Sequence, residues 1–146
     1  MIKMERDFFG KPKGRMRNTV DEKKGKGSRL NRRKIGAEQE VRACQYLAKQ
    51  GVGIRERNFR CRQGEIDIIG YDKDYLVFFE VKYRSGSSRG SAAEAVGFQK
   101  QRKICRVSDY YRMIHGYPFD TPIRFDVIAM DGGRIEWIRN AFSYIG

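Results

Sequence analysis

The sequence predicts an α/β sandwich, in which helices pack on a mixed sheet of about five strands. Two observations lead to this fold class. Stretches with helical spacing of apolar residues alternate with strand-like stretches, in the order helix, three strands, helix, two strands. The chain has 146 residues, of which 40% are hydrophobic, and that is enough for one domain with a buried core.

The first helix is expected at residues 35–51, where "IGAEQEVRACQYLAKQG" has helical spacing and ends at a glycine. Residues 52–63 alternate weakly between polar and apolar side chains and form the first expected strand. The second and third strands are expected at 64–71 and 75–84, because both stretches are rich in β-branched and aromatic residues. A short polar turn joins them.

The second half of the chain predicts one helix and two strands. A loop at 86–91 leads into a long amphipathic helix at 92–116. Residues 123–130 and 134–142 are strand-like and flank the turn sequence "DGG", so we expect them to form a closing hairpin.

Basic residues are concentrated at the N-terminus. Residues 1–34 contain 13 Lys/Arg and 4 Asp/Glu, a net charge of +9, and the whole chain carries +13. Because this segment is rich in glycine and has no apolar periodicity, we expect a flexible arm at 1–34 and a folded domain at 35–146. A functional arm and a solvated tail without a role both fit. A surplus this large favours a polyanionic partner, nucleic acid before an anionic membrane surface.

Targeting and redox signals indicate a cytoplasmic protein. The start "MIKMERDFFG" lacks the apolar run of a signal peptide, and no stretch approaches the ~20 apolar residues of a membrane span. The three cysteines form no C-x-x-C pair and the chain has one histidine, so no zinc site can be assembled at standard spacings. We expect reduced thiols and no membrane partner.

Acidic residues interrupt the two most strand-like stretches, at Glu65, Asp67 and Glu80. Because side chains alternate between the faces of a strand, Glu80 and Lys82 point the same way. If residues 64–71 and 75–84 form a hairpin, Asp67 lies across from Glu80 on one face. The same alternation places Glu65, Asp67 and Ile69 on one face of their strand, and Ile66 and Ile68 on the other.

Two carboxylates that face each other need a compensating charge. A divalent cation such as Mg²⁺ supplies it better than Lys82 alone, because hard cations prefer oxygen ligands. Glu40 falls inside the apolar arc of the first expected helix, whereas Glu38 falls outside it. A glutamate on the core-facing side is costly unless it is paired or binds a metal, so we expect Glu40 to point at the Asp67–Glu80 pair.

Two lysines interrupt the apolar stripe of the second expected helix. We interpret Lys103 as a side chain that extends from the stripe to solvent. For Lys100 two interpretations stay open: the same extension, or a position near the carboxylates from which Lys100 and Gln99 hold a phosphate or a water. Asp126 lies in a predicted strand on the same face as Arg124. We expect it to form an ion pair with Arg124 or a neighbour, and a role in supporting the site is the second interpretation.

An aspartate followed by E-x-K on the adjacent strand resembles the metal-dependent nuclease core of restriction-endonuclease-like and Holliday-junction-resolvase-like enzymes. The longer stretches "IGAEQEVRACQYLAKQG", "RNFRCRQGEIDIIGYDKDYLVFFEVKYRS", "EAVGFQKQRKI" and "IRFDVIAM" resemble, in order, the YraN-like family of uncharacterised bacterial proteins over residues 35–146. This resemblance implies a restriction-endonuclease-like sandwich and a Mg²⁺- or Mn²⁺-dependent nuclease that hydrolyses phosphodiester bonds in DNA, branched DNA included. The family usually has Gly-Glu where this chain has Gln39 and Glu40.

The resemblance also implies roles for individual residues. Lys82 would orient the attacking water or stabilise the charge of the transition state. The ion would be held by carboxylates, with the carbonyl of Val81 as a further candidate ligand. The implied catalytic residues are Glu40, Asp67, Glu80 and Lys82, with Asp67, Glu80 and Glu40 as metal ligands, Gln99, Lys100 and Glu65 as supporting residues, and Arg60, Arg62, Arg84 and Arg89 as nucleic-acid-binding residues.

Two other classes of function stay open at this point. A non-catalytic nucleic-acid-binding domain would keep the fold and the basic surface without a metal, and a small interaction module would need neither. Each of the four arginines could equally be a solvated surface charge. A homodimer is an expectation by analogy with resolvase-like enzymes.

Overall fold

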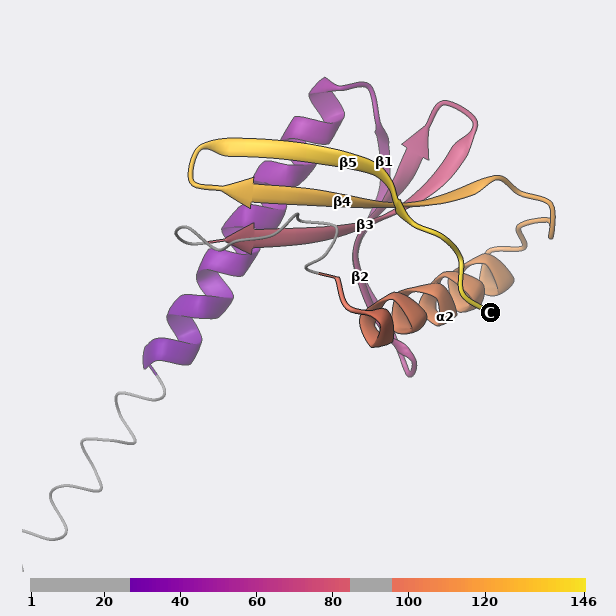
Figure 1. The fold of residues 1–146 in the computed structure, drawn as a ribbon, viewed down its shortest axis with the longest axis horizontal. Coiled ribbons are helices and arrows are strands. Elements are labelled where there is room, and N and C mark those ends of the chain that lie inside the picture. The colour runs from indigo at the N-terminus through magenta and orange to yellow at the C-terminus, as the bar shows by residue number, and fades with distance from the viewer. Residues whose placement is uncertain (1–26, 85–95) are drawn as a thin grey trace, which may run out of the picture. The chain divides into compact units, whose positions relative to one another are not determined.

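The computed structural model describes residues 27–84 and 96–146 of the chain. They form a helix at residues 27–49, here called the N-terminal helix, five strands and a second helix (Figure 1). Within this described part, no helix is both long enough and apolar enough to cross a membrane. The elements after the N-terminal helix are β1 (Gly53–Cys61), β2 (Gly64–Asp72), β3 (Tyr75–Arg84), α2 (Phe98–Ile114), β4 (Ile123–Asp131) and β5 (Arg134–Phe142).

The five strands form one mixed sheet in the order β1-β2-β3-β4-β5. β3 and β4 are parallel, and the other neighbouring strands are antiparallel. A parallel pair needs a crossover connection, and α2 lies within that crossover. The predicted α/β class with a mixed sheet of five strands is confirmed, and the arrangement agrees with a restriction-endonuclease-like sandwich.

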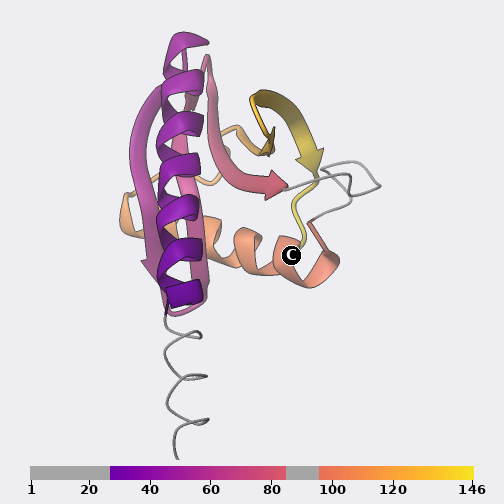
Figure 2. The same cartoon turned by 90° about the vertical axis from the view of Figure 1, so that its left-hand side faces the viewer.

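The helices pack on opposite faces of the sheet. The chain divides into a unit that ends at Ala37 and a unit that spans Glu38–Gly146, and residues 38–49 of the N-terminal helix belong to the second. Figures 1 and 2 show residues 38–49 on one face and α2 on the other. Two buried clusters match these faces. Ile104, Val107 and Tyr111 of α2 pack in one, and Ala43 and Leu47 of the N-terminal helix pack in the other.

The central strand β3 supplies apolar side chains to both clusters. Leu76 and Phe78 pack on the α2 side, whereas Val77 and Phe79 pack on the side of the N-terminal helix. A strand covered on both faces reads as a continuous apolar run, which explains "LVFF". Full burial of each phenylalanine contributes about 2–3 kcal/mol. The first polar residue after this run, Glu80, is therefore held in a well-anchored strand.

Both helices differ from the sequence prediction at their N-terminal ends. Residues 27–34, which were expected in the flexible arm, are helical, and Arg32 Nε donates to the carbonyl of Ser28 at 3.4 Å. This stretch lacks apolar periodicity but consists largely of residues that tolerate a helix. Residues 1–26 lie outside the described part, so the division into arm and domain stays a prediction.

α2 begins at Phe98, later than the expected start at residue 92. Gly97 caps it with an extended backbone, φ −64° and ψ 160°. Residues 92–95 lie outside the described part. Gln101 Nε2 donates to the carbonyl of Val96 at 2.8 Å, which fixes the entry of the chain into the helix.

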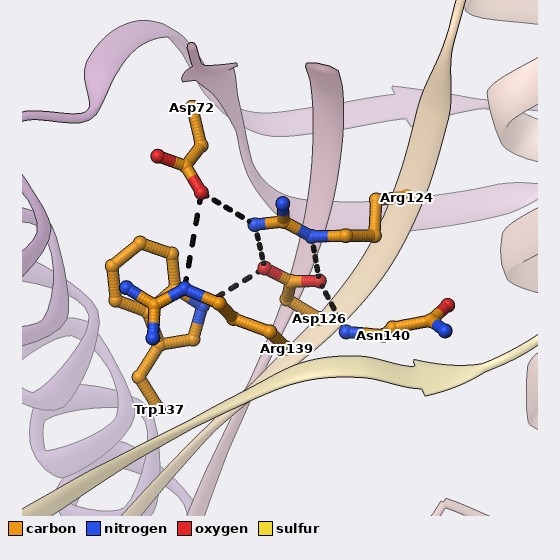
Figure 3. A network of polar contacts seen from close by, with 6 residues as sticks. All are labelled: Asp72, Arg124, Asp126, Trp137, Arg139 and Asn140. Atoms are coloured by element: carbon orange, nitrogen blue, oxygen red, sulfur yellow. Dashed lines mark hydrogen bonds and ion pairs between the residues drawn. The ribbon is translucent and has the colours of Figure 1, made fainter. Parts of the chain in front are cut away.

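A buried polar network joins β4 to β5 and to the end of β2 (Figure 3). Asp126 is fully buried, and its carboxylate accepts hydrogen bonds from Arg124, from Trp137 Nε1 at 2.8 Å and from the backbone N–H of Asn140 at 2.9 Å. Arg124 also pairs with Asp72 at 2.7 Å. The predicted Arg124–Asp126 ion pair is confirmed, and the network satisfies a charge that would otherwise be costly to bury.

Candidate functional site

The candidate site lies at the end of the β2–β3 hairpin that is opposite its turn. The ladder runs from the Asp72–Tyr75 pair to the Ile68–Phe79 pair, and continuing this register places Asp67 opposite Glu80. Beyond the last ladder pair, the backbone N–H of Val81 donates to Asp67 Oδ2 at 2.8 Å. The side chain of Asp67 therefore bridges the two strands, and the charge of Glu80 acts on Asp67, which agrees with the predicted proximity of the two carboxylates.

The alternation of side chains between the two faces of the sheet is interrupted in β2 around Asp67. Ile66 and Ile69 both pack in the cluster under α2, whereas Ile68 packs in the opposite cluster. The expectation that Ile66 and Ile68 share a face is therefore wrong. Unbroken alternation would keep residues two apart on one side, and the strand departs from it around Asp67.

The neighbouring strand β1 has an unusual backbone at the same level. Arg57 pairs with Ile68 in an antiparallel register, so the next residue, Asn58, stands opposite Asp67. Asn58 has φ 54°, the left-handed conformation that asparagine tolerates better than most residues. Its side chain is hydrogen-bonded to Glu40, so Asn58 links the helix glutamate to the level of Asp67.

Two lysines neutralise part of the negative charge at Glu80. The Nζ atoms of Lys82 and Lys100 lie 3.6 Å and 3.5 Å from Glu80 Oε1, and Glu80 itself is only 6% exposed. The shared orientation of Glu80 and Lys82 is confirmed. Of the two interpretations of Lys100, the structure favours the one in which its ammonium reaches the carboxylates.

The charge on Asp67 is less well compensated. Burial and the negative charge of Glu80 raise the pKa of Asp67 to about 7, against the lowering effects of the Val81 N–H and of Lys100. Desolvation and a like charge both disfavour a carboxylate. At neutral pH the pair therefore binds a proton readily, and an additional cation would stabilise its fully charged form.

Glu40 lies in the same electrostatic environment. Burial raises its pKa, the hydrogen bond from Asn58 lowers it, and the charge of Asp67 raises it. Glu40 is half-buried and projects from the part of the N-terminal helix that belongs to the Glu38–Gly146 unit. The charge of Asp67 on β2 thus acts on the helix glutamate, and the orientation of Glu40 toward the Asp67–Glu80 pair stays a prediction.

Asp67 and Glu80 suit a small hard cation as a pair of ligands, without Glu40 as a third. Among residues 27–84 and 96–146, no three His, Cys, Asp or Glu side chains are grouped to hold a metal ion, so Glu40 does not join Asp67 and Glu80 in such a group. Asp67 Oδ1 and Glu80 Oε2 receive no hydrogen bond from another described residue. Mg²⁺ is usually held by one or two carboxylates plus water, so this donor set suits it.

The predicted supporting residues behave differently from one another. Gln99 is exposed, and no hydrogen bond joins it to the carboxylates within the described part of the chain. Glu65 is exposed and pairs with Arg60, with Glu65 Oε2 3.2 Å from Arg60 Nε. Glu65 therefore adds negative charge near Asp67 without contacting Glu80, and its supporting role stays a prediction.

The predicted nucleic-acid-binding arginines surround the site unevenly. Arg60 lies near the end of β1, and Arg62 is exposed in the turn that follows. Arg84 ends β3, on the strand that carries Glu80. Arg89 lies outside the described residues. Their proposed contacts with nucleic acid stay predictions.

Asn58 is the site residue that the sequence analysis missed. A signal for it was present, because asparagine is depleted in strands and enriched in left-handed conformations. An asparagine in the middle of "RERNFRC" therefore indicates a local left-handed backbone within β1, whose pairing with β2 continues on both sides. This position lies opposite Asp67.

Comparison with known proteins gives one consistent result. Residues 39–130 match the model of the uncharacterised protein family UPF0102. The chain is 44% identical over 117 residues to a UPF0102 protein of Lachnoclostridium phytofermentans, which covers 80% of this chain and 99% of that protein. It is 46% identical over 110 residues to a UPF0102 protein of Cupriavidus metallidurans, which covers 74% of this chain and 80% of that protein. Both relatives carry the same uninformative functional description.

Proposed function

The chain belongs to the UPF0102 family of uncharacterised proteins, the family whose resemblance was described from its sequence, and we propose that it is a metal-dependent nuclease. Its substrate is the phosphodiester backbone of DNA, branched DNA included. The observation that carries this proposal is the arrangement of Asp67, Glu80 and the two lysines at Glu80.

The proposal explains why so many charges are placed at a buried strand end. A purely structural ion pair needs one cation for each carboxylate, and here both ammonium groups lie at one oxygen of Glu80. Asp67 receives only a backbone N–H as a hydrogen-bond donor among the described residues. A site that works with a bound cation accounts for the uncompensated carboxylate.

Asp67 and Glu80 are the residues that would hold Mg²⁺ or Mn²⁺. When bound, such an ion lowers the pKa of a water and neutralises negative charge on a phosphate. Glu40 contributes from the N-terminal helix. Its half-buried carboxylate and its hydrogen bond to Asn58 suit a group that accepts a hydrogen bond from water next to Asp67.

The two lysines supply the positive charge that a phosphodiester requires. Lys82 lies on the same face of β3 as Glu80, and its side chain is 32% exposed, so its ammonium can contact a substrate phosphate. Fixed positive charge in a partly buried site stabilises the charge that develops in the transition state. Lys100 approaches the same glutamate from α2 and restrains its carboxylate while Lys82 contacts the substrate.

The proposal is tested by incubating the full chain with linear, flapped and four-way-branched DNA in the presence of Mn²⁺. We expect cleavage by the wild type, and a loss of roughly a hundredfold or more for Lys82→Ala and Glu80→Gln. Asp74→Asn is the matched control, because Asp74 is an exposed carboxylate in the turn at the opposite end of the same hairpin. Cleavage that survives in Glu80→Gln would contradict the proposal.

The second candidate is a non-catalytic nucleic-acid-binding domain. It is favoured by the lack of a three-ligand metal group among the described residues and by the net charge of +13. This candidate predicts salt-dependent binding of DNA without cleavage at any Mn²⁺ concentration. The same assay therefore separates the two candidates.

A further inference from the structure

A groove beside the carboxylates is lined largely by positive side chains. It has a volume of about 390 Å³ and lies between the end of β1, the start of β2 and α2. Its lining residues are Arg60, Cys61, Gly64, Glu65, Lys100 and Lys103. Three cations and one carboxylate give this lining a net charge of +2.

The positive charge of the groove is only weakly neutralised. Lys103 is exposed and forms no ion pair with any residue of the described part. Arg60 pairs with Glu65, but their side chains are 75% and 51% exposed, and exposed pairs contribute little. An anion can therefore replace Glu65 as the partner of Arg60 at low cost.

The shape of the groove depends on a close approach between Gly64, at the start of β2, and α2. Gly64 has φ 146°, and a Cβ atom at this position would lie 3.4 Å from Val107 Cγ2. Since Lys103 and Val107 are four residues apart, they lie on the same side of the helix. The contact between Gly64 and Val107 thus brings the start of β2 next to the side of α2 that carries Lys103.

Lys100 connects the groove to the carboxylate site. It lines the groove, and its Nζ atom lies 3.5 Å from Glu80 Oε1. Lys100 and Lys103 are three residues apart on α2, so their side chains are neighbours on the helix surface. A chain of phosphates that enters the site at Lys100 would therefore continue past Lys103.

We propose that this groove binds one backbone phosphate of a nucleic acid next to the phosphate that is cleaved. Lys103 and Arg60 hold the bound phosphate, and Lys100 separates it from Asp67 and Glu80. The inference rests on the proposed function for its ligand class, but it concerns binding alone. The expected extension of Lys103 to solvent agrees with its exposure, and the proposal adds a phosphate as its ligand.

The test measures binding of a fluorescein-labelled DNA duplex of about 20 base pairs to the full chain in EDTA, as a function of salt concentration. We expect Lys103→Ala to lower the slope of log Kd against log salt by about 1, the change that follows from the loss of one phosphate contact. Arg102→Ala is the control. Arg102 is exposed on the same helix and its replacement removes the same charge, but Arg102 does not line the groove, so we expect a smaller change.

The outcomes distinguish the groove from the nuclease. Equal slopes for Lys103→Ala and Arg102→Ala would overturn the groove and leave the nuclease proposal standing. Absence of any salt-dependent binding of DNA would overturn both. Competition by inorganic phosphate at the same phosphate concentration as the duplex would identify a site for free phosphate, which also contradicts the inference.

Discussion

Asp67 Oδ2 accepts a hydrogen bond of 2.8 Å from the backbone N–H of Val81. The side chain of Asp67 thus continues the contact between β2 and β3 beyond the end of their backbone ladder. The ladder stops at Ile68 and Phe79. One carboxylate oxygen is thereby fixed beside the strand that carries Glu80.

Replacing Asp67 by asparagine should stabilise the metal-free protein at alkaline pH. The folded-state pKa of Asp67 is about 7, above the ordinary value of 3.8, so between about pH 4 and pH 7 the folded state keeps a proton that the unfolded state has lost. The contribution of Asp67 to stability therefore falls as the pH rises through this window. The amide of the variant cannot ionise, and we expect Asp67→Asn to exceed the wild type by on the order of 2 kcal/mol at about pH 8.

Urea unfolding in EDTA at about pH 4 and about pH 8 measures this difference. The advantage of Asp67→Asn should vanish at the lower pH, where the folded wild type keeps its carboxyl protonated and the unfolded chain begins to take up the proton. Asp74→Asn provides a carboxylate-to-amide change at the exposed turn of the same hairpin and should have little effect at either pH. A variant that is less stable than the wild type at alkaline pH would show that the ionised carboxylate is a structural partner.

Replacing Asn58 by glycine should raise the pKa of Glu40. The hydrogen bond from Asn58 lowers this pKa, and glycine keeps the left-handed backbone at φ 54° without a steric cost. Carboxyl-carbon NMR titration measures the pKa directly, and urea unfolding measures the stability. We expect a higher pKa of Glu40 in Asn58→Gly and a modest fall in unfolding free energy near neutral pH, because a raised folded-state pKa lowers stability there.

Asn58→Ala separates the effect of the side-chain amide from the effect of the left-handed backbone. It removes the same hydrogen bond, but a non-glycine side chain in the left-handed conformation costs about 1–2 kcal/mol. Both variants should raise the pKa of Glu40 equally, and Asn58→Ala should unfold more easily than Asn58→Gly. An unchanged pKa of Glu40 in both would mean that Asn58 does not position this side chain.

Removing the ammonium of Lys100 should raise the pKa of Asp67 further. The charge of Lys100 lowers this pKa in the native protein, and Lys100 shares Glu80 Oε1 with Lys82. The same NMR titration applied to Lys100→Ala tests the shift. Lys103→Ala is the neighbouring control on α2, and a rise of equal size in that variant would point to a diffuse effect of net charge.

The network around Asp126 should be structural rather than functional. Asp126→Asn removes a fully buried charge that two side chains and a backbone N–H contact, and loss of one partner in a buried ion pair costs about 3 kcal/mol or more. Trp137 is the only tryptophan of the chain and donates to Asp126, so its fluorescence should report the change. Affinity for Mn²⁺ should stay the same in the folded variant, and a parallel loss of affinity would contradict this separation.

The facing carboxylates were predictable because strand register and alternation are set by local chemistry. The turn "YDKD" between two apolar runs fixes the hairpin, and the register then places Asp67 opposite Glu80 without knowledge of the rest of the fold. The run "LVFF" is likewise typical of a strand that is buried on both faces.

The change of face at Asp67 could not be derived from alternation. The rule assumes an unbroken extended backbone, and the separate clusters of Ile66 and Ile68 show that β2 departs from it around Asp67. Periodicity predicted neither the helical structure of residues 27–34 nor the ion pair between Lys100 and Glu80. The first depends on helix propensity without an apolar face, and the second depends on how α2 docks on the sheet.

Asp67 and Glu80 should together bind one cation, and titration calorimetry with Mn²⁺ measures this. We expect the wild type and Asp74→Asn to bind one ion, and Asp67→Asn and Glu80→Gln each to lose most of the affinity. Equal binding by all four proteins, or no binding by the wild type, would show that the two carboxylates do not form a cation site.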